Sequence, residues 1–344
     1  MLSKLSKHRK RVNMAKWEYT KGLHEVGNGL YAYLLPDGGW CWSNAGLIVD
    51  GDEAVLVDTL FDLPMTSDML STMRDAVPAS QRIGKLVNTH ANADHTWGNQ
   101  LVKEAEIIAS TGCAEEFDHF LPETLLEMMG QTSELGVLGE FLEHCFSPFD
   151  IRGIELTPPT TTFSDEKSIM VGDKKVDLYS VGPAHTRGDI LVHLPDENLM
   201  FAGDILFVGG HPVIWDGPVD NWRKACDKIL ELNPDIVVPG HGPVAGQEEV
   251  RRFRAYLDEI EHEVRKRFNA GMSEMDAAKD IALANYEDWM DAERVYANVA
   301  SIYREIREVP AGEGMTPMEV FAGMAELFKH QKSNGTQGHH GHQH

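Results

Sequence analysis

Two histidines and a carboxylate gather directly after one apolar segment of the chain. Residues 83–87 form a short apolar run, and the next eight residues include His90, Asp94 and His95. A strand that ends in a turn can aim several side chains at one point, because the rigid strand positions what the loop presents. Imidazole nitrogen and carboxylate oxygen are ligands that zinc, iron and manganese accept. The segment therefore predicts a metal site at the end of a strand.

Three further candidate ligands occur in the same local setting. Each follows a short apolar run that reads as a strand: His185 after residues 178–181, Asp204 after residues 199–202, and His241 after residues 235–238. Loops at one edge of a sheet commonly form the active site of a sheet-based enzyme. We therefore expect these three side chains to join the first cluster.

In type, order and approximate spacing, these motifs resemble those of the metallo-β-lactamase superfamily over about residues 25–245. The resemblance implies an α/β (α+β) fold, a four-layer αββα sandwich in which helices cover two facing sheets. It also implies two adjacent metal positions, with zinc as the expected metal and iron or manganese as alternatives. The first would use His90, residue 92 and His185, the second would use Asp94, His95 and His241, and Asp204 would bridge both.

One position departs from the superfamily motif. The motif reads His-x-His-x-Asp-His, and Asn92 stands here in place of the second histidine. An asparagine offers only a neutral amide oxygen, a weaker zinc ligand than imidazole. An asymmetric dinuclear site, a first position filled only with substrate present, and a mononuclear enzyme all remain open. Because His90, His185 and Asp204 are retained, the sequence favours two metals per chain.

Three residues are candidates for a catalytic role. Asp204 would hold the two metals together, and Asp94 would act as a metal ligand or, without that metal, as a general base. His211 lies seven residues after Asp204 on a glycine-rich loop, where it could donate a proton to a leaving group. Asp189 would either orient a ligand histidine or cap a turn.

The ligand types support three hypotheses of function. The first is a hydrolase whose metal-bound hydroxide attacks a small, largely apolar ester, lactone, thioester or amide. The second keeps the hydroxide but displaces a leaving group from an activated aromatic ring, by aryl ether O-demethylation or dehalogenation. Trp40, Trp42, Trp97 and Trp215, expected near the mouth of the site, motivate it. The third, motivated by Asn92, is a partner-dependent or non-catalytic subunit.

Charge and cysteine usage limit the expected partners. The formal net charge is −23, which disfavours nucleic acid and anionic membranes and leaves a small molecule as the expected substrate. The four cysteines are widely spaced, without a Cys-x-x-Cys pair, and this is typical of the reducing cytoplasm. The sequence does not decide between a monomer and a homo- or hetero-oligomer.

The pattern along the chain predicts a catalytic domain with flanking segments. We expect a basic, disordered arm over residues 1–20, the catalytic domain over 21–246 and a helical insertion over 111–147. A helical extension should cover 247–328, with helices at about 247–270, 273–284 and 291–307. The His-rich tail, 329–344, is expected to be disordered.

Overall fold

A computed structural model describes residues 17–36, 39–310 and 313–334. The first of its two sheets contains strands β1 to β7 in sequence order, with β1 to β4 antiparallel and β4 to β7 parallel. These strands are β1 (Gly22–Gly27), β2 (Leu30–Leu34), β3 (Ala45–Asp50), β4 (Glu53–Val57), β5 (Lys85–Val87), β6 (Glu106–Ser110) and β7 (Thr161–Phe163).

The second sheet has the order β12-β11-β10-β9-β8. Its strands are β8 (Glu166–Val171), β9 (Lys174–Ser180), β10 (Ile190–Leu194), β11 (Leu199–Phe207) and β12 (Ile236–His241). Strands β11 and β12 are parallel, and the other neighbours are antiparallel.

A core of aliphatic side chains joins the two sheets. Side chains alternate between the faces of a strand, so β2 directs Leu30, Ala32 and Leu34 into this core and Tyr33 to the opposite face. Val176 and Leu178 of β9 enter the same core from the second sheet. The alternation therefore produces a dry layer between the sheets and a second apolar layer outside the first sheet.

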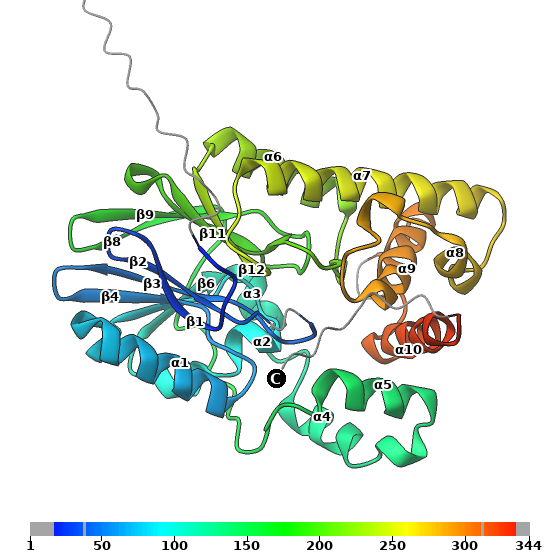
Figure 1. The fold of residues 1–344 in the computed structure, drawn as a ribbon, viewed down its shortest axis with the longest axis horizontal. Helices are drawn as coiled ribbons and strands as arrows, with labels where there is room; N and C mark the ends of the chain where they lie inside the picture. The colour runs from blue at the N-terminus through cyan, green and yellow to red at the C-terminus, as the bar shows by residue number, and fades with distance from the viewer. Residues whose placement is uncertain (1–16, 37–38, 311–312, 335–344) are drawn as a thin grey trace, which may run out of the picture.

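Helices cover the outer face of each sheet (Figure 1). Helix α1 (Leu63–Ala76) begins at Asp62, whose side chain accepts a hydrogen bond from the amide of Met65, and it packs its buried face on the first sheet. Helices α6 (Val219–Leu232) and α7 (Gln247–Asn269) cover the second sheet. The fold is the αββα sandwich that the sequence predicted.

The insertion and the extension gather at one end of the sandwich (Figure 1). The insertion consists of α3 (Thr111–Glu116), α4 (Pro122–Met129) and α5 (Val137–Phe146). The extension continues from α7 with α8 (Glu274–Asp280), α9 (Val295–Ile306) and α10 (Pro317–Ser333). Helices α7, α8 and α9 correspond to the three helices expected individually. Helix α10 begins inside the expected helical extension, where no separate helix was predicted, and it continues to Ser333, so residues 329–333 are helical and were wrongly expected to be disordered.

The ends of the described chain extend the fold on both sides. The Trp17 ring nitrogen donates to the carbonyl of Glu25, and the Tyr19 hydroxyl donates to that of Leu35, so residues 17–20 lie against the first sheet. Residues 1–16 of the predicted arm and 335–344 of the predicted tail lie outside the described residues. Within the described ranges, no helix is long and apolar enough to cross a membrane.

Candidate metal centre

The candidate ligands come from four parts of the two sheets. After β5, the chain passes through His90 into the short helix α2 (Ala93–Thr96), which carries Asp94 and His95. His185 lies on the loop between β9 and β10, and His241 is the last residue of β12. Asp204 lies inside β11, which continues past the expected end at residue 202 with an irregularity at Gly203. All these elements meet at one end of the sandwich.

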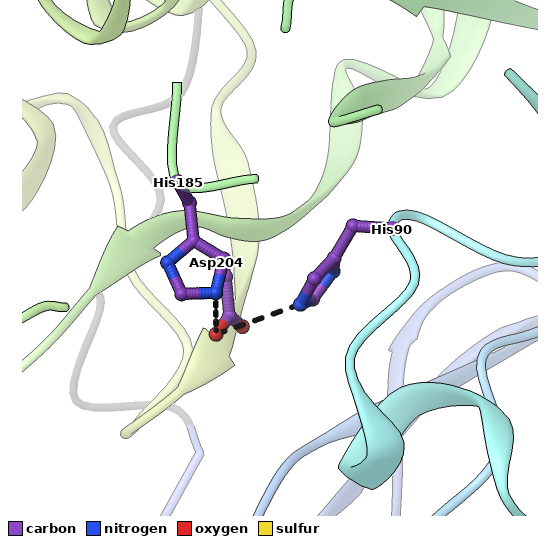
Figure 2. Close-up of side chains that lie close together, drawn as sticks. All are labelled: His90, His185 and Asp204. Carbon is purple, nitrogen blue, oxygen red and sulfur yellow. Dashed lines mark ion pairs between the residues drawn. The ribbon is translucent and has the colours of Figure 1, made fainter. Parts of the chain in front are cut away.

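The Asp204 carboxylate is the centre of the cluster (Figure 2). Its oxygens lie close to the Nε2 atoms of four imidazoles, at 3.1 Å for His95, 3.3 Å for His185, 3.3 Å for His241 and 3.8 Å for His90. A Cβ at Gly240 would overlap the same carboxylate, so this position needs glycine for the close approach. The ligands form two groups, His90 with His185 and Asp204, and Asp94 with His95 and His241.

Each imidazole is oriented by a contact at its other ring nitrogen. The Nδ1 atoms lie 3.0 Å from the Thr89 hydroxyl for His90, 2.9 Å from the Asp58 carboxylate for His95, 2.7 Å from the Val213 carbonyl for His185 and 3.1 Å from the Trp42 carbonyl for His241. Such contacts fix the orientation of a ligand histidine and raise its basicity. As a result, all four Nε2 atoms face the centre.

The atoms at the centre are those that a divalent cation would use. His90 Nε2 is buried and makes no hydrogen bond, and the buried His95 Nε2 and Asp204 Oδ1 form an ion-pair contact of 3.1 Å with each other. A buried polar atom without a partner is costly, and such atoms are uncommon in native proteins. Imidazole nitrogens and carboxylate oxygens together form a suitable donor set for zinc. The residues present therefore fit a metal.

Burial and mutual charge place most of these groups in their metal-binding protonation state. Burial lowers the pKa of His90 and of His185 below the ordinary value, which leaves neutral imidazoles. Burial acts to raise the pKa of Asp204, but the neighbouring His241 and His95 outweigh it and hold that pKa well below its usual range. Neutral imidazole and ionised carboxylate are the forms that bind metal.

The nearby carboxylates raise the pKa of the other two imidazoles, those of His95 and His241. Burial opposes their charged form, but Asp204 and Asp94 outweigh it, raising the pKa of His241 to about 9 and that of His95 well above its ordinary value. Asp94 itself has a pKa of about 2, because His95 and His241 more than offset its burial. The cluster thus carries an excess of negative charge that holds protons, and a cation would take their place.

Asp58 contacts a candidate ligand histidine and was not among the site residues predicted from the sequence. Besides contacting His95, it accepts hydrogen bonds from the backbone amide and the hydroxyl of Thr89. It directly follows β4 and has a left-handed φ of 61°. The same rule that selected the ligands, a polar side chain at the end of a strand, would have selected Asp58.

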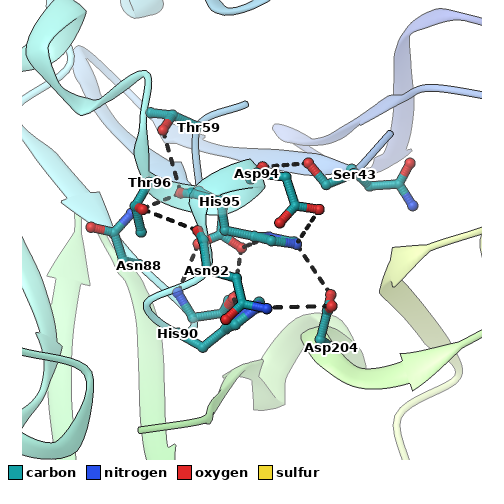
Figure 3. Close-up of polar contacts among 12 residues, drawn as sticks. Ser43, Thr59, Asn88, His90, Asn92, Asp94, His95, Thr96 and Asp204 are labelled. Carbon is teal, nitrogen blue, oxygen red and sulfur yellow. Dashed lines mark hydrogen bonds and ion pairs between the residues drawn. The ribbon is translucent and has the colours of Figure 1, made fainter. Parts of the chain in front are cut away.

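Asn92 lies at the centre, beside His90 and Asp204 (Figure 3). Its amide nitrogen is 3.0 Å from His185 Nε2. A half-turn of the amide group would bring its oxygen to the same place. Asn92 therefore occupies the position expected for a ligand of the first metal, with a neutral amide where the motif has imidazole.

The remaining sequence candidates have different surroundings. Asp94 Oδ2 lies 3.3 Å from His241 Nε2, as expected for a member of the second ligand group. Asp189 caps a turn by accepting from the amide and hydroxyl of Thr186, and it does not contact a ligand histidine. His211 is buried, with its Nδ1 3.0 Å from the Tyr256 hydroxyl, and it is not among the residues that line the cavity described next.

A cavity of about 350 Å³ opens on the metal cluster. Its wall includes Asn92, Asp94, His185, Asp204 and His241 on one side, and on the others the aromatic residues Trp40, Phe61, Phe117, Phe120, Phe146, Phe207, Trp215 and Phe321. Two of the four tryptophans expected near the site thus line it, whereas Trp97 stacks on Phe61 in the core and Trp42 packs on Phe149. The insertion and the extension both contribute to this wall.

The chain is similar to known proteins over most of its length. A family model of the metallo-beta-lactamase superfamily matches residues 38–241. The type 2 metallo-beta-lactamase of Bacteroides fragilis is 30% identical over 247 residues, covering 68% of this chain and 84% of that protein. The acyl-coenzyme A thioesterase MBLAC2 of Homo sapiens is 25% identical over 226 residues, covering 61% of this chain and 77% of that protein.

A solved structure extends the similarity of the fold into the helical extension. The stereoselective inverting sec-alkylsulfatase Pisa1 from Pseudomonas sp. superposes with a TM-score of 0.63 at 16% identity, covering 92% of this chain. The chain spans 57% of the length of that sulfatase. The matching family model covers more than half of the chain, and the relatives named above are hydrolases. The chain therefore belongs to the metallo-β-lactamase superfamily.

Proposed function

We propose that this protein is a metal-dependent hydrolase that cleaves an ester or thioester of a small, largely apolar molecule, with lactones and amides as related substrates. The observation that supports this most directly is the cavity that joins the Asp204 cluster to a wall of aromatic side chains. Thioesters are included because one relative is named as an acyl-coenzyme A thioesterase.

The proposed cofactor is zinc, at two positions per chain. His90, Asn92 and His185 would hold one ion, Asp94, His95 and His241 would hold the other, and Asp204 would contact both. When bound in such a site, zinc lowers the pKa of a coordinated water to about 7 and polarises an ester carbonyl.

The protein's own residues supply orientation and a dry surface. The Nδ1 contacts of the four histidines hold the ligands in place before substrate arrives, which is the arrangement that rapid chemistry requires. The aromatic wall excludes water from the apolar part of the substrate and positions its reactive bond next to the metal ligands.

A second candidate keeps the same site and changes the substrate. Trp40, Trp215 and Phe321 bring flat aromatic surfaces to the cavity, and these would also accept an activated aromatic ring. The reaction would then displace a methoxy group or a halide from that ring.

The expected setting is a reducing compartment and a small-molecule substrate. A reducing compartment is supported because the cysteines are free and buried, namely Cys41, Cys113, Cys145 and Cys226. A small-molecule substrate is supported by the net charge of −23, because this charge repels nucleic acid and anionic membranes.

A substrate panel tests the proposal. Purified protein would be assayed with aryl acetates, acyl thioesters and lactones, and in parallel with nitroaryl methyl ethers and halides. Hydrolysis of esters or thioesters that is lost with a chelator, restored by zinc and absent in Asp204→Ala is expected. Turnover of only the nitroaryl substrates would establish the second candidate. No turnover of any substrate by metal-loaded protein would overturn both and favour a partner-dependent or non-catalytic subunit.

A further inference from the structure

The C-terminal helix α10 forms part of the active-site wall, although it lies far from the metal ligands in sequence. Pro317, Val320 and Phe321 of α10, together with Met315 just before it, line the same cavity as Asp204 and His241. The family model ends at residue 241, so this part of the wall lies outside the region that carries the metal site.

Phe321 is the member of α10 that lies between the aromatic residues of the other walls. Its ring centroid is 5.5 Å from that of Trp40 and 5.9 Å from that of Trp215. Phe146, at the end of the insertion helix α5, lies 6.0 Å away. Phe321 thus connects the sandwich, the insertion and the extension in one aromatic surface.

The position of Phe321 is well defined, because α10 is anchored at several points. Thr316 and Glu319 form a reciprocal capping box at its start. Gly323 touches the ring of Tyr296 on α9, and a Cβ at this position would overlap that ring. Phe328, two turns further along, packs on Phe141 of α5 at 5.3 Å. Because α10 is anchored at these points, the part of the cavity wall that Phe321 forms has a fixed position.

The two phenylalanines of α10 have different surroundings. Phe321 lines the cavity, whereas Phe328 contacts Phe141 and His144 and is absent from the cavity lining. Both are partly buried members of the same apolar cluster. Phe328 is therefore a matched control for a role that depends on contact with substrate.

We propose that Phe321 sets the length of the apolar chain that a substrate can carry, and that the natural substrate is an ester or thioester with an extended acyl chain. This inference rests on the proposed hydrolase function. The acyl carbonyl would lie at the Asp204 cluster and the chain would extend along the aromatic wall until it meets Phe321. Replacing Phe321 with alanine would enlarge the cavity at this part of its wall and leave the metal ligands unchanged.

The test compares wild type, Phe321→Ala and Phe328→Ala on straight-chain p-nitrophenyl esters and acyl thioesters from acetyl to dodecanoyl. One buried methylene changes kcat/KM by about fourfold (~0.8 kcal/mol). For wild type, kcat/KM should rise with chain length and fall beyond an optimum. In Phe321→Ala the optimum should move to longer chains, mainly through KM, and Phe328→Ala should keep the wild-type optimum. Phe321→Leu, which retains more of the wall, should give an intermediate optimum and replaces the alanine variant if that variant does not fold.

A binding measurement separates this inference from the proposed function. Neutral 1-alkanols from butanol to decanol would be titrated calorimetrically into each protein, without any turnover. A longer preferred alkanol in Phe321→Ala supports the role of Phe321 in limiting chain length even if wild type hydrolyses none of the esters, which would overturn the proposed function and the ester or thioester substrate with it. Equal shifts in both alanine variants, or an unchanged chain-length profile in Phe321→Ala, would overturn the inference while leaving ester hydrolysis intact.

Discussion

Four imidazoles meet Asp204 through the same ring nitrogen because a neighbouring group holds each of them at the other nitrogen. Two of these groups are backbone carbonyls, of Trp42 and Val213, and therefore do not depend on side-chain identity. The other two are the Thr89 hydroxyl and the Asp58 carboxylate. Of these partners, Asp58 is the one whose charge can be removed with little change in shape.

Asp58→Asn should weaken metal binding without removing a ligand. The amide cannot supply the negative charge that orients and polarises His95, and losing such a partner typically costs about 10–100-fold in metal affinity. Competition with a chromophoric chelator would measure the change. Asp62→Asn is the matched control, because Asp62 is equally buried but binds the amides of Met65 and Asp150. Equal affinity losses in both variants would show that Asp58 has no specific role.

Asn92→His should strengthen binding at the first metal position. Asn92 already lies 3.0 Å from His185 Nε2, so an imidazole placed there would add a stronger zinc ligand next to His90 and His185. The chelator concentration that removes half of the more weakly held metal should rise by about tenfold or more. An unchanged release curve would mean that position 92 does not face the metal.

At the residue level, the clustering of the candidate ligands could be predicted, and some of their neighbours could not. His90 and His185 lie on loops that follow strands and His241 is the last residue of one, and the apolar runs of the sequence indicate these strands directly. The carbonyl partners carry no sequence signal, because every residue has a backbone carbonyl that could serve. Only the geometry of the folded site decides which carbonyls are used. His211 is on a glycine-rich loop as expected, but the extension packs Tyr256 and Trp289 around its ring. That burial depends on helices remote in sequence.

Among the secondary-structure elements, α10 has the clearest consequence for the site. It packs against α5 of the insertion and against α8 and α9 of the extension. Its start carries a Thr-Pro-x-Glu sequence at Thr316 to Glu319, which combines a capping box with a proline in the first turn. This signal could have predicted the start of the helix, although the sequence-based prediction did not use it. Its role in the cavity wall was not predictable, because it depends on contacts with residues such as Trp40 that are far away in sequence.

Gly323→Ala should destabilise the protein even though alanine favours helices. The helix propensity gain is about 1 kcal/mol, whereas overpacking a close contact costs about 1–3 kcal/mol. The overlap with the buried ring of Tyr296 should therefore prevail. Urea denaturation would measure the free energy of unfolding, with Glu326→Ala on the exposed face of the same helix as the control, expected to lie within about 0.5 kcal/mol of wild type. A gain in stability for Gly323→Ala would show that α10 is not held tightly against α9.

At the scale of the whole molecule, the sandwich, the insertion and the extension share one site. The sandwich was predictable because its strands alternate and its helices have regular apolar spacing. The full set of residues that line the cavity was not, because its wall combines Phe61, Phe146, Trp215 and Phe321 from separate parts of the chain. Local periodicity carries no information about which helices meet at one end of a sheet.

Glu293 makes the stability of the folded protein depend on pH at the contact between the extension and the sandwich. It lies on a 3-10 helix (Ala292–Arg294), accepts a hydrogen bond from the Trp40 ring nitrogen at 2.8 Å and has Asp291 and Arg294 as charged neighbours. Burial, followed by the charge of Asp291, raises its pKa to about 7. Since the folded-state pKa exceeds the unfolded one, the folded protein binds the extra proton. This contribution to stability is complete below the unfolded pKa and is lost as the pH rises through about 7.

Glu293→Gln should therefore be relatively more stable than wild type at alkaline pH than at acidic pH. One pKa unit corresponds to about 1.4 kcal/mol, so the difference between variant and wild type should change by a few kcal/mol across this range. Chemical denaturation of both proteins at pH 5 and pH 8.5 measures it, with the glutamine retaining an acceptor for Trp40. Parallel pH profiles would show that the Glu293 carboxyl titrates normally in the folded protein.

The number of metal ions that each chain binds decides whether the Asp204 cluster is a metal site. Elemental analysis would be made on tag-free protein purified without added metal, alongside Asp204→Ala, which removes the carboxylate that all four imidazoles approach. His211→Ala, which alters a buried histidine outside the cavity lining, is the control. We expect about two zinc ions per chain in wild type and in the control, with a clear loss in Asp204→Ala. Metal content that is negligible in wild type, or equal in all three proteins, would contradict the assignment of a metal site to the Asp204 cluster.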